Sequence, residues 1–212
     1  MSKAIQILIA DNHEVVRAGI KSLLKDTDIR IVAEAQNGNE VLGAIGQCEL
    51  DLALLDVSLP DVDGLNCLAR IKVDEPDLPV VMFTTHNNPT YIARAVALGA
   101  SGYVLKSVDR ETLIDNISDA SRGEPIWTHE ELRRVTGALM TPRVPLEVEA
   151  PLTRREDEVL KQLAFGLTNK EIARALGISY ETVKEHVQHI LRKIGVSDRT
   201  QAAVWAVRKG LV

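Results

Sequence analysis

Polar and charged residues stand directly after short apolar runs at four places in the first half of the 212-residue chain. One run ends at Asp11 and Asn12, another at Asp56, and two more lead to Thr84 and Lys106. A carboxylate can attack a phosphoryl group to give an acyl phosphate, while a hydroxyl and an ammonium group can hold phosphoryl oxygens. These are the residue types that phosphoryl transfer to a carboxylate needs, if the fold brings the run ends together.

The apolar runs have the length and the Val, Ile and Leu content of buried strands. They cover residues 5–10, 29–35, 52–55, 80–83 and 102–105. Stretches of helical period separate them, and one such helix is expected to start at Asn88-Pro89 and to end at Gly99. Five strand-helix units predict an α/β doubly wound, flavodoxin-like parallel sheet. In such sheets the site lies beyond the carboxyl ends of the strands, where these polar residues stand.

The set of run ends resembles the receiver domain of two-component response regulators. The matching segments are Ile-Ala-Asp-Asn-His (9–13), Leu-Leu-Asp-Val-Ser-Leu-Pro-Asp-Val-Asp-Gly (54–64), Met-Phe-Thr-Thr (82–85) and Gly-Tyr-Val-Leu-Lys (102–106). The resemblance implies that Asp56 is the phosphoacceptor, assisted by Thr84 and Lys106, and that Thr84 and Tyr103 form the switch. It also implies a Mg²⁺ site, whose ligands are Asp11, Asn12, Asp56 and the backbone carbonyl of Ser58.

Asn12 departs from the receiver pattern, because most receivers have a second aspartate there that contacts the metal. An amide oxygen can still coordinate Mg²⁺, but one formal negative charge is missing. We therefore expect Mg²⁺ to bind more weakly than in a receiver with two adjacent aspartates. Ser58 and His86 occupy the positions that, in this family, influence how fast the acyl phosphate hydrolyses.

The C-terminal 62 residues are predicted to form helices only. Thr153 to Glu156 and Thr168 to Glu171 are capping boxes of the S/T-x-x-E type, and each opens an amphipathic segment. The second of these helices is expected to run to Leu176. After a tight turn, Ser179 should cap a longer helix that extends to about residue 194. A short helix, a turn with glycine and a longer helix predict a helix-turn-helix.

This part of the chain resembles the LuxR-type DNA-binding domain, so the whole chain resembles a NarL/FixJ-type response regulator. The segments that carry the resemblance are Leu-Thr-Arg-Arg-Glu (152–156), Gly-Leu-Thr-Asn-Lys-Glu-Ile-Ala (166–173), Leu-Gly-Ile-Ser (176–179), Thr-Val-Lys-Glu-His-Val (182–187), Ile-Leu-Arg-Lys-Ile-Gly-Val (190–196) and Arg-Thr-Gln-Ala-Ala (199–203). The resemblance implies double-stranded DNA as a partner, with Lys184 and Gln188 facing base edges. Glu185 could accept a hydrogen bond from cytosine or repel phosphate. The expected phosphate contacts are Asn169, Lys170, Thr182 and Arg192. The active protein is expected to be a homodimer whose contact is formed by the last helix, roughly residues 198–209.

Charge is distributed unevenly along the chain. Residues 1–123 hold 11 Lys and Arg against 18 Asp and Glu, whereas residues 151–212 hold 11 against 7. An acidic part joined to a basic part is expected when only one of them meets an anionic polymer. Half of the eight prolines, Pro125, Pro142, Pro145 and Pro151, lie between residue 124 and the first residue of the basic part. We therefore predict a receiver over 1–123, a partly helical linker with Leu132 and Val135 over 124–150, and a DNA-binding domain over 151–212.

Composition excludes several classes of protein. With 45% apolar and 26% charged residues the chain is neither disordered nor membrane-spanning, since no run approaches the ~20 apolar residues of a bilayer span. The N-terminus shows neither a secretory cleavage pattern nor a transit peptide, so a cytoplasmic location is expected.

Two alternatives to a phosphorylation-controlled transcription regulator stay open. A phosphatase of the HAD type also uses an aspartate after a parallel strand. It requires a second aspartate two residues further on as acid and base, and this chain has Ser58 at that position. The protein is therefore not expected to be an enzyme beyond its own phosphorylation and dephosphorylation at Asp56. The phosphoryl group would come from a sensor histidine kinase or a small phosphodonor. In the other alternative the receiver is not phosphorylated and a protein or ligand controls DNA binding, which only Asn12 favours.

Overall fold

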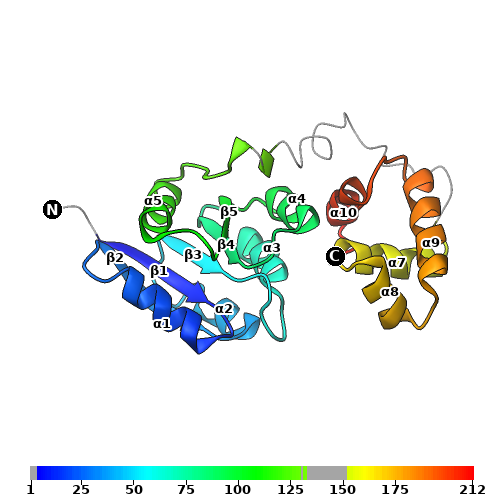
Figure 1. Ribbon diagram of the computed structural model, residues 1–212. Helices are drawn as coiled ribbons and strands as arrows, with labels where there is room; N and C mark the ends of the chain where they lie inside the picture. The colour runs from blue at the N-terminus through cyan, green and yellow to red at the C-terminus, as the bar shows by residue number, and fades with distance from the viewer. Residues whose placement is uncertain (1–3, 130, 133–151) are drawn as a thin grey trace. The chain divides into compact units, whose positions relative to one another are not determined.

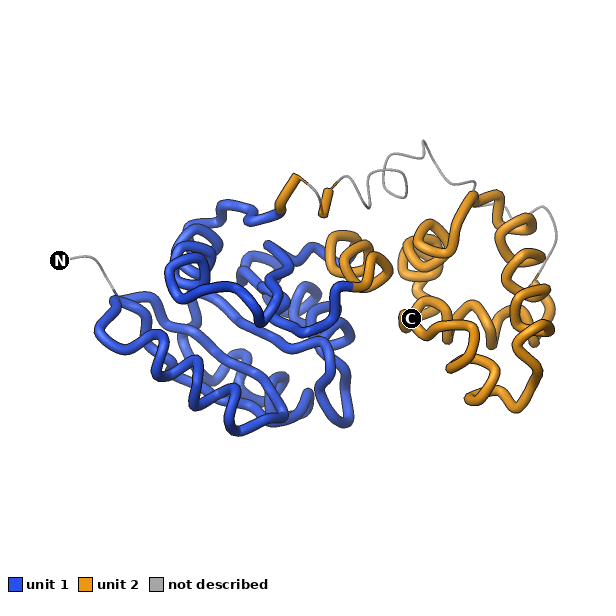
Figure 2. Tube along the Cα trace, viewed as in Figure 1, with its two compact units in different colours: residues 1–87, 98–127 blue, residues 88–97, 128–212 orange. Residues whose placement is uncertain are grey.

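The computed structural model describes residues 4–129, 131–132 and 152–212 (Figure 1). Contacts divide the chain into two compact units, residues 1–87 with 98–127 and residues 88–97 with 128–212 (Figure 2). Val135 and most of the predicted linker, residues 124–150, lie outside the described residues. No helix in the described parts of the chain is long and apolar enough to cross a bilayer.

The first unit contains the predicted five-stranded parallel sheet with strand order β2-β1-β3-β4-β5 (Figure 1). Its strands are β1 (Ile5–Ala10), β2 (Ile29–Ala35), β3 (Leu52–Leu55), β4 (Val80–Thr84) and β5 (Gly102–Leu105). The flavodoxin-like order confirms the predicted fold class. All five predicted runs are strands, and only β4 differs, because it continues by one residue to Thr84. Since β1 and β3 are neighbours, the residues that follow them meet at one edge of the sheet.

Helices cover both faces of this sheet. They are α1 (Glu14–Leu23), α2 (Gly38–Ala44), α3 (Gly64–Asp74) and α5 (Arg110–Ser121). Ile7 and Ile9 of β1 share one apolar core with Ile20 of α1 and Leu113 of α5. Because side chains alternate along a strand, the intervening Leu8 faces the other side, where α2 and α3 contact each other. The sheet is therefore buried on both faces, as its nearly continuous apolar strands require.

The second unit contains α4 (Pro89–Ala97), α7 (Arg154–Ala164), α8 (Asn169–Leu176), α9 (Tyr180–Lys193) and α10 (Arg199–Arg208). The helix predicted from Asn88-Pro89 is confirmed as α4, and the Asn88 carboxamide oxygen accepts a hydrogen bond from Thr90 N at 2.9 Å. Within this unit α4 contacts α10. The Asn88 amide also donates to Gly166 O at 3.2 Å, and the Arg94 guanidinium lies 5.3 Å from the centroid of the Phe165 ring.

Both predicted capping boxes are present in the helical domain. The Thr153 and Thr168 hydroxyls accept from the backbone N–H of Glu156 and Glu171, and the two glutamates bond back to the capping residues. Gly177 ends α8 in the left-handed region, with φ 64° and ψ 38°, which explains the glycine in the turn. Ser179 then caps α9, as predicted. These local signals fix where the helix-turn-helix begins, turns and ends.

Gly64 at the start of α3 lies too close to the loop after β3 to carry a side chain. A Cβ atom there would be 1.9 Å from Asp56 O, whereas a Cβ at Gly19 in α1 would meet nothing within 4 Å. We predict that Gly64→Ala lowers the free energy of unfolding by about 1–3 kcal/mol through overpacking. Gly19→Ala should raise it by about 0.5–1 kcal/mol, because alanine favours the helix. Urea denaturation of both variants tests this, and equal stabilities would contradict the packing described for Gly64.

Candidate functional site

Two buried carboxylates lie side by side at the carboxyl edge of the sheet. Asp11 follows β1 and is 1% exposed, and Asp56 follows β3 and is 4% exposed. The pairing of β1 with β3 brings them together, and Asp56 N donates to Ala10 O at 2.9 Å. Lys106, which follows β5, places its Nζ 2.5 Å from Asp11 Oδ2 and 3.0 Å from Asp56 Oδ2. The residues that follow three separate strands thus form one cluster of charged side chains, Asp11, Asp56 and Lys106, which we call the pocket.

A single ammonium group compensates two carboxylates in this pocket. Burying like charges side by side is costly unless a cation neutralises them, and Lys106 itself is only 11% exposed. Two carboxylates and one ammonium leave a formal charge of about −1 at the edge of the sheet. The pocket is therefore suited to bind a further cation. Its ammonium group can also form an ion pair with an anion that enters the pocket.

The oxygens of this pocket fit a hard divalent cation. Asp11 Oδ2 and Asp56 Oδ1 are buried and accept no hydrogen bond from the described residues, although the Lys106 ammonium forms an ion pair with the first at 2.5 Å. Asn12 and Ser58, the other predicted ligands, are exposed beside the two aspartates. The described residues hold no cluster of three or more His, Cys, Asp or Glu side chains that could bind a metal by themselves. Mg²⁺ needs only one or two carboxylates when phosphate oxygens and waters complete its shell, so the donor set fits it.

Two residues that sequence reasoning missed hold Asp11 in place. The buried guanidinium of Arg17 donates from Nη1 to Asp11 O at 2.7 Å, and its Nε lies 3.5 Å from Glu34 Oε2. His13 N donates to Asp11 Oδ1 at 2.9 Å, and the His13 ring lies 3.3 Å from the same oxygen. A signal for Arg17 was present, because this charged residue falls at helical spacing from Ile20 and Leu24 on the buried face of α1.

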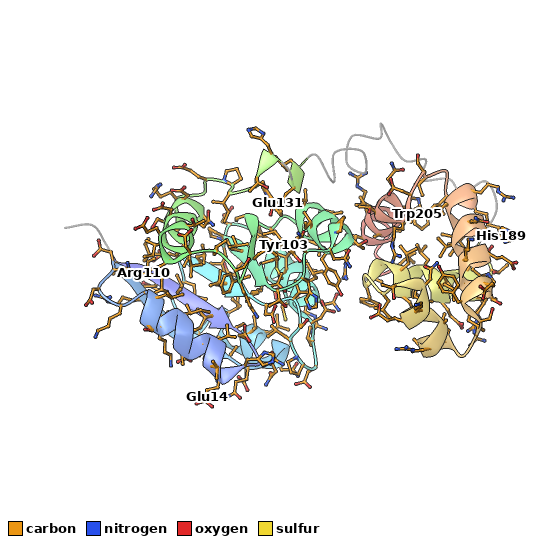
Figure 3. The ribbon with its side chains drawn as sticks, viewed as in Figure 1. Glu14, Tyr103, Arg110, Glu131, His189 and Trp205 are labelled. Atoms are coloured by element: carbon orange, nitrogen blue, oxygen red, sulfur yellow. The ribbon has the colours of Figure 1, made fainter. Side chains whose placement is uncertain are left out.

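The predicted switch residues meet at His86. Thr84 is buried and its hydroxyl oxygen accepts from His86 N at 3.3 Å. Tyr103 is also buried, inside the first unit (Figure 3), and its hydroxyl donates to His86 O at 2.6 Å. The His86 ring lies 2.8 Å from the Ser58 hydroxyl, two residues after Asp56. His86 therefore joins the loop that follows Asp56 to both predicted switch residues, which their spacing in the sequence did not reveal.

The predicted DNA-contacting side chains lie at the N-terminus of α8 and along one face of α9. Lys170 on α8 is exposed, while Asn169 is half-buried beside it. On α9, Thr182 is half-buried and its hydroxyl hydrogen-bonds to Ser179 at 2.9 Å. The exposed predicted contacts on this helix are Lys184, Glu185, Gln188 and Arg192. His189 also projects outward from α9 (Figure 3). Val183 and Ile190 are buried on the opposite side of the helix, so the polar face is free to meet a ligand.

A partly buried ion pair connects α9 to α7. Lys193 Nζ, at the end of α9, lies 2.7 Å from Glu156 Oε2 in the capping box of α7. Burial alone would raise the pKa of the Glu156 carboxyl, but hydrogen bonds from Lys193 and Thr153 outweigh burial and bring this pKa down to about 2. Elsewhere in the domain, Arg199 Nη2 of α10 donates to Leu167 O, between α7 and α8, at 2.6 Å. The Lys193–Glu156 contact therefore holds the C-terminal end of α9 against the start of α7.

Comparison with known proteins agrees with this geometry. Residues 7–118 match the response regulator receiver domain, and residues 150–206 match the luxR family of bacterial regulatory proteins. The chain is similar to the response regulator protein VraR of Staphylococcus aureus, with 36% identity over 209 residues that cover 98% of this chain and 99% of VraR.

Two solved structures resemble the whole chain. One is ChrA, the response regulator of a heme-sensing two-component system, with 32% identity, full coverage of both chains and a TM-score of 0.53. The other is RcsB from Salmonella enterica serovar Typhimurium bound to promoter DNA, with 24% identity, 95% of this chain and 97% of RcsB covered, and a TM-score of 0.63. The likeness to RcsB shows the fold alone.

The charge at position 12 should set how tightly the pocket binds Mg²⁺. We predict that Asn12→Asp tightens Mg²⁺ binding at least about fivefold, because one more negative charge near the cation is worth ~1 kcal/mol even in a watery setting. Titration calorimetry with MgCl₂ measures the effect. Gln47→Glu is the matched control, since it adds the same charge in the loop before β3, at the opposite edge of the sheet. If Asn12→Asp binds Mg²⁺ no tighter than the control, position 12 does not contribute to the cation site.

Proposed function

The chain belongs to the response regulators that join a receiver domain to a LuxR-type DNA-binding domain, and from this premise we propose that phosphorylation of Asp56 controls its binding to DNA. The observation that carries the proposal is the pocket in which Lys106 Nζ contacts both Asp11 and Asp56. Response regulators are not generally enzymes. The chemistry proposed here is limited to phosphorylation of Asp56 and its reversal.

In the proposed reaction an oxygen of the Asp56 carboxylate attacks the phosphorus of a phosphohistidine on a sensor kinase, or of a small phosphodonor. The new O–P bond forms as the bond from phosphorus to the donor breaks, and the donor keeps that electron pair. Lys106 then has a more highly charged partner than a carboxylate, because an acyl phosphate carries about 1.5–2 negative charges. The Thr84 hydroxyl is a donor that can bond to a phosphoryl oxygen.

Asp11, Asp56, the carbonyl of Ser58 and the carboxamide of Asn12 are the groups proposed to hold Mg²⁺. When bound, this cation neutralises charge on the phosphoryl group during transfer. Arg17 and His13 keep Asp11 oriented toward the pocket through the carbonyl and the carboxylate of that residue. The missing charge at Asn12 leaves this chain more dependent on Lys106 for neutralisation than a receiver with two adjacent aspartates.

His86 is the proposed route from the pocket to the helices of the second unit. If the Thr84 hydroxyl turns toward the phosphoryl group, its hydrogen bond with His86 N breaks. The loop at His86 can then move, which would change the hydrogen bond from Tyr103 to His86 O. Two residues further along the chain, Asn88 caps α4 and donates to Gly166 O in the loop between α7 and α8. A movement of His86 would thus also move Asn88, the residue that caps α4 and bonds to Gly166.

DNA binding is proposed for the exposed face of α9, with Lys184, Glu185 and Gln188 in the major groove and the N-terminus of α8 on the phosphate backbone. Support comes from the helix-turn-helix geometry, from the positive balance of residues 151–212 and from the fold shared with DNA-bound RcsB. The active form is proposed to be a homodimer through α10, which would read inverted half-sites about one helical turn apart.

Phosphorylation of Asp56 is tested by intact-mass spectrometry after incubation with acetyl phosphate. We predict one phosphoryl adduct in the wild type with Mg²⁺, little without it and none in Asp56→Asn. Asp61→Asn is the matched control, since Asp61 is exposed in the same loop, and it should still form the adduct.

The absence of an adduct from acetyl phosphate and from a kinase, with DNA binding intact, would contradict a phosphorylation switch. It would favour the receiver as a docking or dimerisation domain that responds to a protein or ligand. An adduct that persists in Asp56→Asn would instead mean that another residue accepts the phosphoryl group.

Salt dependence separates backbone contacts from base contacts. We predict that Lys170→Ala weakens binding to all duplexes similarly and lowers the slope of log Kd against log salt concentration by about 1, because one phosphate contact is lost. Lys184→Ala should mainly relax base preference at one position of the half-site, where it costs about 1–3 kcal/mol of discrimination. Fluorescence anisotropy over a series of salt concentrations measures both effects. Unchanged binding in both variants would exclude the groove model.

A further inference from the structure

Tyr180, the first residue of α9, exposes a large part of its aromatic side chain. It is 44% exposed, and no other large apolar side chain is exposed in the described residues 152–212. Its backbone position is well defined, because Ser179 caps the helix and accepts from Thr182 N at 3.0 Å. Leaving an aromatic ring in water forgoes the free energy of burying it, so a ligand that covers this ring would gain that free energy.

The position of Tyr180 on the helix places it in the row of proposed base contacts. Tyr180, Lys184 and Gln188 are spaced four residues apart, and residues with this spacing are neighbours on one helix face. The N-terminal residues of a recognition helix are those that approach base edges most closely. The ring therefore precedes Lys184 in the same row, in reach of the base pair next to the one that Lys184 would contact.

The neighbouring charges favour a base edge over the DNA backbone as the contact of Tyr180. Glu181 and Glu185 are both exposed within the first two turns of α9, and phosphates would repel these carboxylates. This part of the helix is thus better suited to the middle of the groove than to its phosphate walls. Among the groups that bases present in the major groove, the C5-methyl of thymine is the apolar one, and apolar side chains contact it.

We propose that Tyr180 is a specificity-determining residue that contacts the C5-methyl group of a thymine in each half-site, next to the base pair read by Lys184. This inference rests on the proposed DNA-binding function. The contact uses the ring and not the hydroxyl, so phenylalanine can replace tyrosine, and uracil cannot replace thymine without loss.

The test uses the full-length protein and a duplex selected by the wild type from a random pool. Each thymine in the selected site is replaced in turn by deoxyuridine, which removes only the methyl group, and Kd is measured by fluorescence anisotropy. At one thymine per half-site we expect deoxyuridine to weaken binding about fourfold for the wild type, the loss of about one buried methyl group. Tyr180→Phe should show the same loss at that thymine, whereas Tyr180→Ala should bind both duplexes equally.

Three results would overturn the inference. If Tyr180→Ala keeps the wild-type loss at every thymine, or if the wild type is insensitive to every replacement, Tyr180 contacts no thymine methyl. A uniform loss of affinity in Tyr180→Phe, independent of sequence, would assign the hydroxyl to a phosphate contact. If the wild type selects no sequence at all, the proposed DNA-binding function fails, and that failure is visible before any variant is compared.

Discussion

The structure depends on the neutralisation of two buried carboxylates by one lysine at the carboxyl edge of the sheet. The strand order puts β1 beside β3, so Asp11 and Asp56 must be neighbours, and Lys106 after β5 reaches both. Without the ammonium group, the repulsion and desolvation of the two carboxylates would be costly. The same arrangement makes the pocket responsive, because any arriving cation or phosphoryl group changes what Lys106 must neutralise. Because Asn12 is neutral, the pocket has no third carboxylate to attract a cation, and neutralisation depends more on Lys106.

The hydrogen bonds around His86 are the proposed link between a charge change in the pocket and a change in structure. Ser58, Thr84 and Tyr103 come from three different segments, and each contacts a different atom of His86. A rearrangement of one contact therefore disturbs the other two. The chain then enters α4 through Asn88, whose side chain both caps that helix and bonds to Gly166. Packed elements of this kind tend to move between discrete arrangements and not continuously, which suits a two-state switch.

Sequence patterns predicted the fold well because the fold is determined by local signals. Apolar runs gave all five strands, and threonine and serine caps gave the starts of α7, α8 and α9. The residues of the pocket were found for a topological reason, since every parallel strand ends at the same edge. Arg17, His13 and the contacts of His86 could not be found in this way, because they depend on side-chain conformations across segments far apart in the sequence. The exposure of Tyr180 is of the same kind, since burial at the first residue of a helix follows from its neighbours in space.

An acyl phosphate on Asp56 is proposed to change the affinity of this protein for DNA. The most direct measurement is the Kd of the full-length protein for its selected duplex, before and after treatment with phosphodonor and Mg²⁺, for the wild type and Asp56→Asn at one salt concentration. We expect Kd to change about fivefold or more in the wild type and to stay constant in Asp56→Asn, since a typical coupling between two sites is about 1–3 kcal/mol. Equal Kd values for the phosphorylated and unphosphorylated wild type would contradict control of DNA binding by phosphorylation.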